Sequence, residues 1–536
     1  MKFSFEKYRS LTACALSLVT GTAMAQKQER PNFIFFIADD MTIDMFNCLS
    51  EGEKANYTPN RDKLANEGTL MVNQYVSATV STPSRYGCLT GRYASTASNP
   101  DFLRQTKNNQ GQRAVEWNTH IMPGEDNMAS LLKKGGYTTG AVGKNHVFEV
   151  AKHKTVPLSA DVSDPKVMKQ QLDNYRNTIE AYQACGFDYA DGIFYENPIF
   201  NGPKALAVHN LDWTTEAALK FLDRAKKTPF FLSFATTLPH APHDAASSWN
   251  ADRRITPIGI LDKAPDVLPD KKTIPERLKS ANIPFSNHKA NLLWIDDALG
   301  ALVEKLKANG QYDNTIILFF NDHGQSAKGT VYQGAVSNPS IVWRSKGFGV
   351  GKVCNSMVSN IDFLPTIIDW AGVDNFPKSI SGVSFAPALD GKMAESRESL
   401  YFEIGYSRGV KKGNFKYIAL RYPQWVKELT FADRVKILSD YSKKLAARGK
   451  EPNNTDPNAP FGHVQIVPGG GDAEFQAIRQ YPHYQDTDQL YDLSVDPKEQ
   501  HNLAGNLEYQ QVLEDMKNEL IKYIQEIPGG FGELKK

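Results

Sequence analysis

The chain has 536 residues, of which 41% are hydrophobic and 23% are charged, and its formal net charge is +1 at pH 7. This composition is typical of a folded protein with one large hydrophobic core and a second domain, and it excludes an intrinsically disordered chain. The near-zero net charge excludes a basic nucleic-acid-binding protein, so any affinity for an anionic ligand must come from a local cluster of cations.

Residues 1–25 have the pattern of an export signal. A basic start is followed by an apolar run from Leu11 to about Thr20 and by Ala23-Met24-Ala25, a small-residue cleavage site. We expect this segment to be removed on export, with the mature chain in the periplasm. Cys14 lies in a sequence similar to a lipobox, but most of the apolar run follows it, so a lipoprotein is the weaker alternative, together with a secreted protein. The rest of the sequence predicts no transmembrane segment.

Four short apolar runs each end in a group of polar residues. The runs are residues 33–37, 141–142, 230–234 and 316–320, and the polar residues after them are Asp39 and Asp40, Lys144 and His146, His240, and Asp322 and His323. Continuous apolar runs that alternate with helical patterns predict an α/β fold, with a large, mostly parallel sheet between layers of helices. Ligands of such sheets bind beyond the carboxyl ends of the strands, so we expect all four groups to face one crevice.

Residues 81–92 predict a helix with a candidate nucleophile at its start. Ser81 or Thr82 is expected to cap this helix, and Pro83 suits the first helical position because its missing N–H would have no partner there. The free N–H groups favour an anion, and Arg85 adds a permanent charge with donors that suit sulfate or phosphate. A serine in this place is by itself usually only a cap.

The chain is predicted to divide after residue 398. Residues 290–307 have the leucine periodicity of a helix and lead into the apolar run at 316–320. From Ser399 the pattern changes to short strands joined by a turn. We therefore expect an N-terminal domain at 26–398 and a smaller C-terminal α+β subdomain at 399–536, which contains an antiparallel sheet and completes a substrate pocket.

Asp39, Asp40 and Asp322 provide three carboxylates, which are the hard oxygen donors that calcium or magnesium prefers. An Asp-Asp pair at the end of a strand has a simpler interpretation as a turn and helix cap. The Asp322-His323 pair at the end of another strand favours the metal site.

Five positions in residues 81–91 fit the pattern (Cys or Ser)-x-Pro-x-Arg-x-x-x-x-Thr-Gly, namely Ser81, Pro83, Arg85, Thr90 and Gly91. The segment resembles the signature of type I, formylglycine-dependent sulfatases, in the serine form of bacterial members of the alkaline phosphatase superfamily. The resemblance implies an alkaline phosphatase-like fold, with residues 26–398 as the catalytic domain. It also implies that a maturation enzyme oxidises Ser81 to formylglycine (3-oxoalanine), whose hydrate has two hydroxyls with different tasks.

Two further motifs resemble the same family in chain order. Gly143-Lys144-Asn145-His146 is similar to Gly-Lys-Trp-His, with Asn145 in place of the Trp, and Pro239-His240-Ala241-Pro242 matches Pro-His-x-Pro. By this resemblance, Lys144 is a sulfate ligand and His146 is the base that releases sulfate. His240 is a sulfate ligand and the general acid to the leaving oxygen.

The resemblance also completes the set of sulfate and metal ligands. Lys328 follows Asp322 and His323 at the spacing of a second sulfate-binding lysine, although an exposed loop lysine is its alternative interpretation. Ser337 stands where the next motif of the family has an Arg. The implied metal is one Ca²⁺ per chain, and the residues implied to hold it are Asp39, Asp40, Ser81, Asp322 and His323.

These features predict an exported sulfatase that hydrolyses sulfate esters of carbohydrates, with a sulfated saccharide as substrate. Two alternatives stay open: a formylglycine-dependent phosphonate or phosphodiester hydrolase, and a non-catalytic protein that binds sulfated glycans. Five residues are candidates for sugar contacts, although each is more often an ordinary surface or packing residue: Arg104, Arg408, Arg421, Trp425 and His483.

Overall fold

The computed structural model describes residues 30–374, 377 and 379–534. The predicted export signal, residues 1–25, lies outside this range. Among the described residues, none of the helices has the length and apolar character that a membrane span requires. Cys48, Cys88, Cys185 and Cys354 are free thiols.

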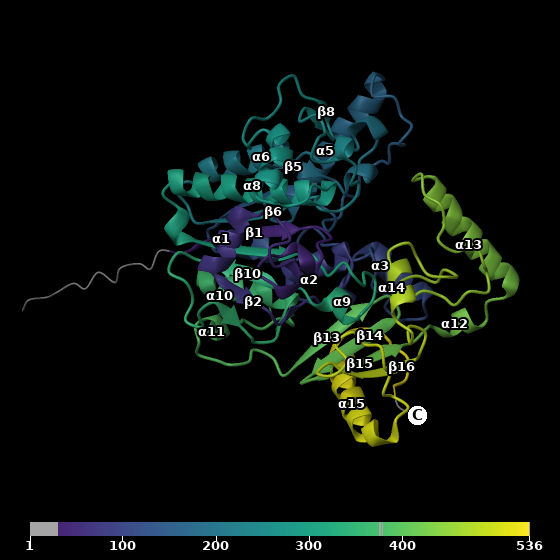
Figure 1. Ribbon diagram of the computed structural model, residues 1–536. Coiled ribbons are helices and arrows are strands. Elements are labelled where there is room, and N and C mark those ends of the chain that lie inside the picture. The colour runs from purple at the N-terminus through teal and green to yellow at the C-terminus, as the bar shows by residue number, and fades with distance from the viewer. Residues whose placement is uncertain (1–29, 375–376, 378, 535–536) are drawn as a thin grey trace, which may run out of the picture.

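An eight-stranded sheet lies at the centre of the molecule, with the order β11-β2-β10-β9-β1-β6-β4-β5 (Figure 1). The strands from β9 to β5 in this order are parallel to their neighbours, and β10 is antiparallel to both β9 and β2. The bounds of the strands are β1 (Asn32–Ala38), β2 (Thr69–Met71), β4 (Thr138–Lys144), β5 (Tyr189–Phe194), β6 (Phe230–Ala235), β9 (Thr315–Asn321), β10 (Ser340–Trp343) and β11 (Val353–Cys354). The predicted mostly parallel sheet is confirmed.

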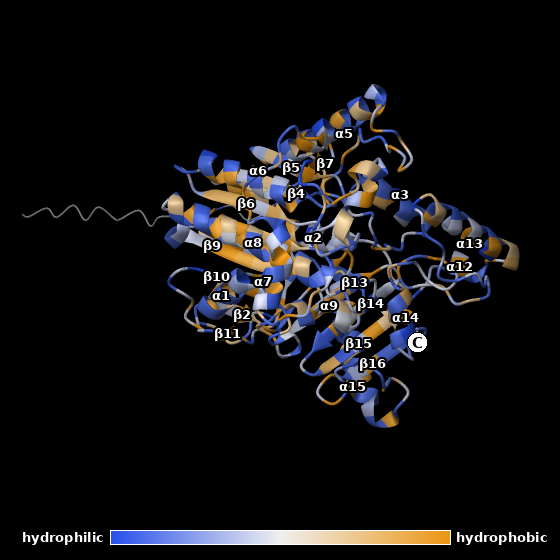
Figure 2. Cartoon of the chain, turned by 45° about the horizontal axis from the view of Figure 1, so that its top comes forward, coloured by the Kyte–Doolittle hydropathy of each residue, from blue (hydrophilic) through white to orange (hydrophobic). Residues whose placement is uncertain are grey.

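Helices cover both faces of this sheet, which explains why its central strands are apolar throughout. Every residue of β1 is buried. Ile34 and Phe36 pack toward one layer of helices, and Phe33 and Phe35 pack toward the other. The first layer is α1 (Pro59–Glu67), α6 (Leu211–Arg224), α7 (Ile274–Ser280) and α8 (Asn287–Ala308), and the second is α2 (Ser81–Thr90), α4 (Met128–Lys134), α5 (Pro165–Ala184) and α10 (Phe363–Ala371). Figure 2 shows the hydrophobic strands β6 and β9 enclosed in this way.

A second, antiparallel sheet of four strands follows in the chain, and it packs on both faces. Tyr417 and Ala419 of its strand β15 pack toward α15, whereas Ile418 between them joins the core of the main sheet. This alternation is the two-residue period of a strand between two layers. The two sheets therefore share one hydrophobic core. The elements are β13 (Ser399–Ile404), β14 (Ser407–Lys412), β15 (Phe415–Leu420), β16 (Asp488–Asp492) and α15 (Gln510–Glu526).

The remaining elements are shorter or lie at the periphery. Helix α13 extends away from the sheets in Figure 1. The other helices are α3 (Pro100–Asn108), α9 (Gln333–Val336), α11 (Ala386–Leu389), α12 (Gln424–Lys427), α13 (Phe431–Ala446) and α14 (Phe475–Gln480), and the two-residue strands are β3 (Gln74–Tyr75), β7 (Ile255–Thr256), β8 (Gly259–Ile260) and β12 (Val358–Ser359).

A buried ion pair joins the second sheet to α9. Lys416 Nζ of β15 lies 2.8 Å from Glu499 Oε1, and both side chains are fully buried. The backbone N–H of Gln333, the first residue of α9, donates to Glu499 Oε2 at 2.6 Å. Burial lowers the pKa of Lys416 and raises the pKa of Glu499, and the attraction between the two charges counteracts both shifts.

The substitution Lys416→Met is expected to destabilise the protein because it leaves the Glu499 carboxylate buried without its cation. The free energy of unfolding should fall by about 3–5 kcal/mol, measured by urea unfolding with tryptophan fluorescence. Lys436→Met is the matched control, since it removes an exposed pair with Asp440 and should leave the unfolding midpoint unchanged. Equal losses in both variants would show that burial does not set the cost.

Candidate functional site

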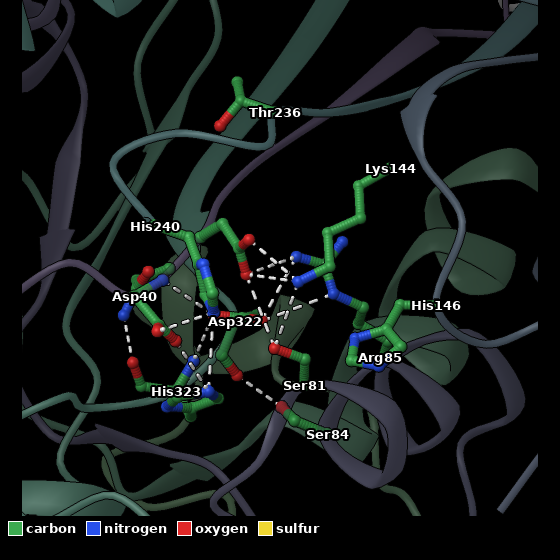
Figure 3. Close-up of polar contacts among 12 residues, drawn as sticks. Asp40, Ser81, Ser84, Arg85, Lys144, His146, Thr236, His240, Asp322 and His323 are labelled. Atoms are coloured by element: carbon green, nitrogen blue, oxygen red, sulfur yellow. Dashed lines mark hydrogen bonds and ion pairs between the residues drawn. The ribbon is translucent and has the colours of Figure 1, made fainter. Parts of the chain in front are cut away.

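The carboxyl ends of four neighbouring parallel strands bring the polar residues together. The order β9-β1-β6-β4 aligns Asn321 with Ala38 and Ala235 with both Ile37 and Gly143, so the strands end at one level. Each polar group of the sequence follows one of these ends. Figure 3 shows their side chains converging on Ser81, which comes from the first turn of α2.

Ser81 does not cap its helix. The cap position of α2 is Val80, no side chain accepts a bond from the helix start, and Pro83 is the third helical residue. The prediction that Ser81 or Thr82 caps the helix is therefore wrong. The Ser81 hydroxyl instead lies 3.4 Å from Asp39 Oδ1 and 3.4 Å from Lys144 Nζ, so it faces the polar cluster.

Two cations hold the carboxylates on one side of Ser81. Lys144 Nζ donates to both oxygens of Asp39 at 2.8 Å. The Arg85 guanidinium donates to Asp322 Oδ2 at 3.1 Å and to Asp39 Oδ1 at 3.3 Å, which links the ends of β1 and β9. Burial and the neighbouring Asp322 carboxylate raise the pKa of Asp39, and Lys144 counteracts that shift. For Arg85, attraction to Asp322 and Asp39 outweighs burial, so its pKa is raised and its charge is fixed.

A glycine allows Lys144 to lie this close to the sheet. Gly143 has a φ of +89°, and a Cβ on it would lie 1.8 Å from the Ala235 carbonyl oxygen. No other residue fits this left-handed, crowded position at the end of β4. The Gly-Lys sequence is therefore a requirement of the backbone as well as of the site.

Asp40 lies in a second group on the other side of Ser81. Lys328 Nζ donates to both oxygens of Asp40 at 2.7 Å, and His240 Nε2 lies 3.4 Å from Asp40 Oδ2. Burial would raise the pKa of Asp40, but Lys328 and His240 outweigh it, and the pKa lies well below its ordinary value. The side chain of Lys328 is 11% exposed and that of His240 is 19% exposed, so these two residues form the solvent side of the site.

Asp40, Asp322 and His323 form a candidate site for a divalent metal. One ligand atom from each lies within 4.8 Å of the others. The His323 Nδ1 faces the Gly324 carbonyl at 3.1 Å and so carries the hydrogen, which leaves a lone pair on Nε2. This buried Nε2 has no hydrogen-bond donor or acceptor assigned to it within the described part of the chain, and it lies 3.2 Å from Asp40 Oδ1. Acceptors that face one another in this way are satisfied by a cation, and the oxygen-rich set suits a hard one.

The other two residues of the implied metal set are placed differently. Both oxygens of Asp39 accept from Lys144, and Ser81 Oγ lies beside that pair. Asp39 and Ser81 therefore border the metal group, while Asp40, Asp322 and His323 form it.

The two candidate acid–base histidines lie on different sides of Ser81. His240 Nδ1 lies 3.0 Å from the Ala241 carbonyl, which leaves Nε2 to face the site. His146 Nε2 lies 2.8 Å from Glu196 Oε1. Burial lowers the pKa of His240, although Asp40 and Asp39 counteract this, and burial together with Lys144 lowers the pKa of His146 to about 4. His146 is therefore a neutral base at pH 7.

Sequence reasoning missed two residues of the site, Glu196 and Asn197. Asn197 is buried, and with its amide nitrogen toward Asp39 Oδ2 at 2.9 Å its oxygen accepts from Lys144 Nζ at 3.0 Å and from His240 Nε2 at 3.1 Å. Both residues follow β5, the strand beside β4. Only Ile193 and Phe194 form an apolar end of β5, with Asp191 before them, so the sequence signal here was weaker than at the other four groups.

The five residues considered for sugar contacts bond elsewhere. Arg408 is buried and donates to the carbonyls of Gly405 and Ser407. The other contacts are Arg104 with Asp101, Arg421 with Asp488, Trp425 with Asn109, and His483 with Asp486.

Comparison with known proteins identifies the family. The sequence profile of the sulfatases matches residues 31–373, and a profile described as N-sulphoglucosamine sulphohydrolase, C-terminal, matches residues 321–438. The uncharacterized sulfatase YdeN of Escherichia coli (strain K12) is 27% identical over 411 residues, which are 71% of this chain and 65% of that protein. The chain thus spans less than two thirds of the length of this relative. An N-acetylglucosamine-6-O-sulfatase of Bacteroides thetaiotaomicron is 26% identical over 473 residues, which are 73% of this chain and 77% of that protein.

A solved structure agrees with the fold. This structure, described under the metabolism of glycosaminoglycans by Bacteroides thetaiotaomicron, has a TM-score of 0.58 and 20% identity, over 93% of this chain and 99% of that one. The family profile covers more than half of the chain, and the strand order places the signature serine at the end of the central sheet. The chain therefore belongs to the sulfatase family, the sulfuric ester hydrolases with an alkaline phosphatase-like fold.

Proposed function

We propose that this sulfatase hydrolyses sulfate esters of carbohydrates, with a formylglycine made from Ser81 and one Ca²⁺ bound by Asp40, Asp322 and His323. One observation supports this most strongly. The Ser81 hydroxyl does not cap its helix. It lies 3.4 Å from both Lys144 Nζ and Asp39 Oδ1, among charged side chains. A nucleophile in this position meets a bound anion directly.

The charges of the site suit a sulfate ester. The three carboxylates balance the three cations, namely Asp39, Asp40 and Asp322 against Arg85, Lys144 and Lys328. A divalent cation beside them makes the site positive, which favours an anionic substrate. The donors of Arg85, Lys144 and Lys328 come from three different elements, so they can surround the sulfuryl oxygens, where charge must be stabilised in the transition state.

Formylglycine and Ca²⁺ would supply chemistry that the side chains alone lack. Formylglycine, in its hydrated form, supplies one hydroxyl to attack sulfur and a second whose deprotonation lets sulfate leave, which a plain serine cannot do. Ca²⁺ supplies a Lewis acid for a sulfuryl oxygen and for an ionised hydroxyl.

The chain provides the acid and the base. The Ala241 carbonyl holds a hydrogen on His240 Nδ1, so only the doubly protonated ring carries a proton on Nε2 as well. That second proton faces Asp40 Oδ2 and the Asn197 oxygen, and it is the one delivered to the departing alcohol, which leaves His240 neutral. This histidine lies on the solvent side of the site, where the alcohol part of the ester must be. The His146 side chain is 10% exposed, and its pKa is lowered to about 4. Its buried Nδ1 has no hydrogen-bond partner among the described residues, which suits a base that accepts the proton of the second hydroxyl.

Two observations support a carbohydrate as the alcohol part of the ester: the names of the relatives, and the burial of the side chains around Ser81. One relative is named as acting on N-acetylglucosamine 6-sulfate, and a similar structure belongs to glycosaminoglycan metabolism. Because Ser81, Arg85 and Lys144 are buried, only the sulfate group can enter, and a saccharide must lie outside, past His240. Arg448, just after α13, lies 4.9 Å from the Phe200 ring, beside the segment that carries Asn197. This contact supports a role of residues 399–536 in the substrate pocket.

We further propose that residues 1–25 direct the chain to the periplasm and that a maturation enzyme modifies Ser81 during or before export. The export signal and the serine form of the signature support both steps. Sulfated glycans from outside the cell are the substrates that fit this location.

Ser81→Ala is expected to abolish sulfate release, because no formylglycine can form. Ser81→Cys, made in a host that oxidises cysteine in this signature and checked by mass, is expected to retain it. Sulfate release from a panel of sulfated mono- and oligosaccharides is the measurement, and Ser163→Ala, which changes an exposed serine, is the control. Release of phosphonate or cleavage of a phosphodiester, with no sulfate release by fully modified protein, would replace the proposal with the first alternative. Glycan binding without any hydrolysis would replace it with the second.

Calcium is expected to raise the melting temperature of the wild type, because it binds the folded site and not the unfolded chain. At a hundredfold excess over its dissociation constant, the stabilisation should be about 2.7 kcal/mol. Asp322→Ala should lose this calcium-dependent shift, whereas Asp440→Ala, which changes an exposed carboxylate, should keep it. Thermal melting with and without EDTA measures the effect. A full shift in Asp322→Ala would contradict the proposed ligand set.

His240→Ala is expected to slow the release of sulfate from a saccharide by about 10²–10⁴-fold, because a sugar alkoxide is a poor leaving group without a proton. The same variant should lose much less activity on an aryl sulfate with an acidic phenol. Steady-state kcat/KM values on the two substrates measure the difference, and His243→Ala is the control. An equal loss on both substrates would remove His240 from the role of general acid.

A further inference from the structure

Glu196 lies opposite His146 because of the register of the sheet. Strands β4 and β5 are parallel, and Lys144 pairs with Phe194 at their ends. Beyond the strands, the backbone N–H of Asn145 donates to the Phe194 carbonyl at 2.8 Å and that of His146 to the Tyr195 carbonyl at 3.4 Å. The same register carried two residues further places His146 beside Glu196. The contact is therefore built by the backbone of two strands and not by a chance meeting of loops.

The contact determines which nitrogen of His146 carries the hydrogen. Nε2 lies 2.8 Å from Glu196 Oε1, and a carboxylate can only accept, so Nε2 is the donor. In a neutral imidazole the lone pair is then on Nδ1. This atom is buried and has no hydrogen-bond partner among the described residues. Figure 3 shows the His146 ring beside Arg85, on the side of the site that holds Ser81.

The surroundings keep the pair in this form. The His146 and Glu196 side chains are only 10% and 27% exposed. Burial, Lys144 and Arg85 all lower the pKa of His146, and Glu196 is the group that counteracts them. Burial raises the pKa of Glu196, but the contact with His146, including its hydrogen bond, and attraction to Lys144 outweigh it, so the carboxylate stays ionised. His146 also has a φ of +57°, a backbone conformation that a residue with a Cβ adopts at a cost.

We propose that Glu196 is a positioning residue, which holds His146 in the Nε2–H tautomer with the Nδ1 lone pair available to the group at Ser81. The proposal rests on the proposed function only in that His146 is the base of the reaction. Glu196 has no task at the reacting atoms, and it acts through the orientation and tautomer of the imidazole. Without it, Arg85 and Lys144 would face a ring with no fixed tautomer.

The tautomer of His146 can be measured without any activity. We expect ¹⁵N chemical shifts of histidine-labelled, unmodified Ser81 protein at pH 7 to show His146 protonated on Nε2 and not on Nδ1, with the signal assigned by its loss in His146→Gln. In Glu196→Gln the ring should become a mixture of tautomers. The matched control is Asp486→Asn, which removes a carboxylate 2.8 Å from His483 in an exposed pair and should leave the His146 signal unchanged.

The kinetic consequence is a loss of kcat with little change of KM, because Glu196 acts on the base and not on substrate binding. In fully modified protein, Glu196→Gln should lower kcat by about 10–100-fold with KM within about twofold of the wild type. Glu196→Asp keeps a carboxylate and should retain part of the wild-type kcat. The control Asp486→Asn should have the full wild-type kcat. Circular dichroism checks the fold of each variant, and if Glu196→Gln does not fold, the wild-type tautomer and Glu196→Asp decide.

Two results would overturn the proposal: an Nδ1–H tautomer in the wild type, or a Glu196→Gln protein with unchanged tautomer and kcat. These are distinct from a failure of the proposed function. A wild-type protein that releases no sulfate would remove the reaction, but the tautomer measurement on unmodified protein would still show whether Glu196 orients His146.

Discussion

The site depends on a balance of buried charge. Moving one ion from water into a protein interior costs several kcal/mol, and the cost is recovered only when an opposite charge and hydrogen bonds satisfy it. Here the carboxylates after β1 and β9 are satisfied by cations from α2, from the end of β4 and from the segment after β9. No one of these elements could hold its charged residue in place alone. The strand ends must therefore meet at one place for the buried charges of the site to be paired.

The same charges explain why the reactive position lies at a helix start. Residue 81 is the first residue of α2, where the helix has free N–H groups and the positive end of its dipole. Arg85 lies one turn further and reaches the carboxylates from the same helix. An anion at this place meets the helix end, Arg85 and Lys144 together. The helix is anchored at its other end by Gly91 in the left-handed conformation, so its start is fixed relative to the sheet.

Burial divides the site into two environments. The residues around Ser81 are almost completely enclosed, whereas His240 and Lys328 retain some exposure. The second sheet contributes to the same core, and Arg448 just after α13 lies 4.9 Å from the Phe200 ring.

The sequence alone determined the main elements and most of the site. A strand buried on both faces must be apolar throughout, and a polar residue directly after it must lie at the sheet edge, so residues 33–37 and 316–320 predicted both β1 and β9 and the place of Asp39, Asp40 and Asp322. Helical periodicity likewise predicted α8, and the signature from Ser81 to Gly91 predicted the family. These signals are local, because the burial of a strand and the periodicity of a helix appear in consecutive residues.

Only the tertiary structure decided which groups meet. The order of the strands puts β5 beside β4, which brings Glu196 to His146 and Asn197 to Asp39. The sequence of β5 is too polar to predict a buried strand. The structure also turned Ser81 from an expected helix cap into a side chain that faces Lys144. It further decided that the C-terminal sheet shares the main core. These outcomes depend on contacts between residues far apart in the chain. A residue pattern indicates which of its residues are buried, but not which distant residues they contact.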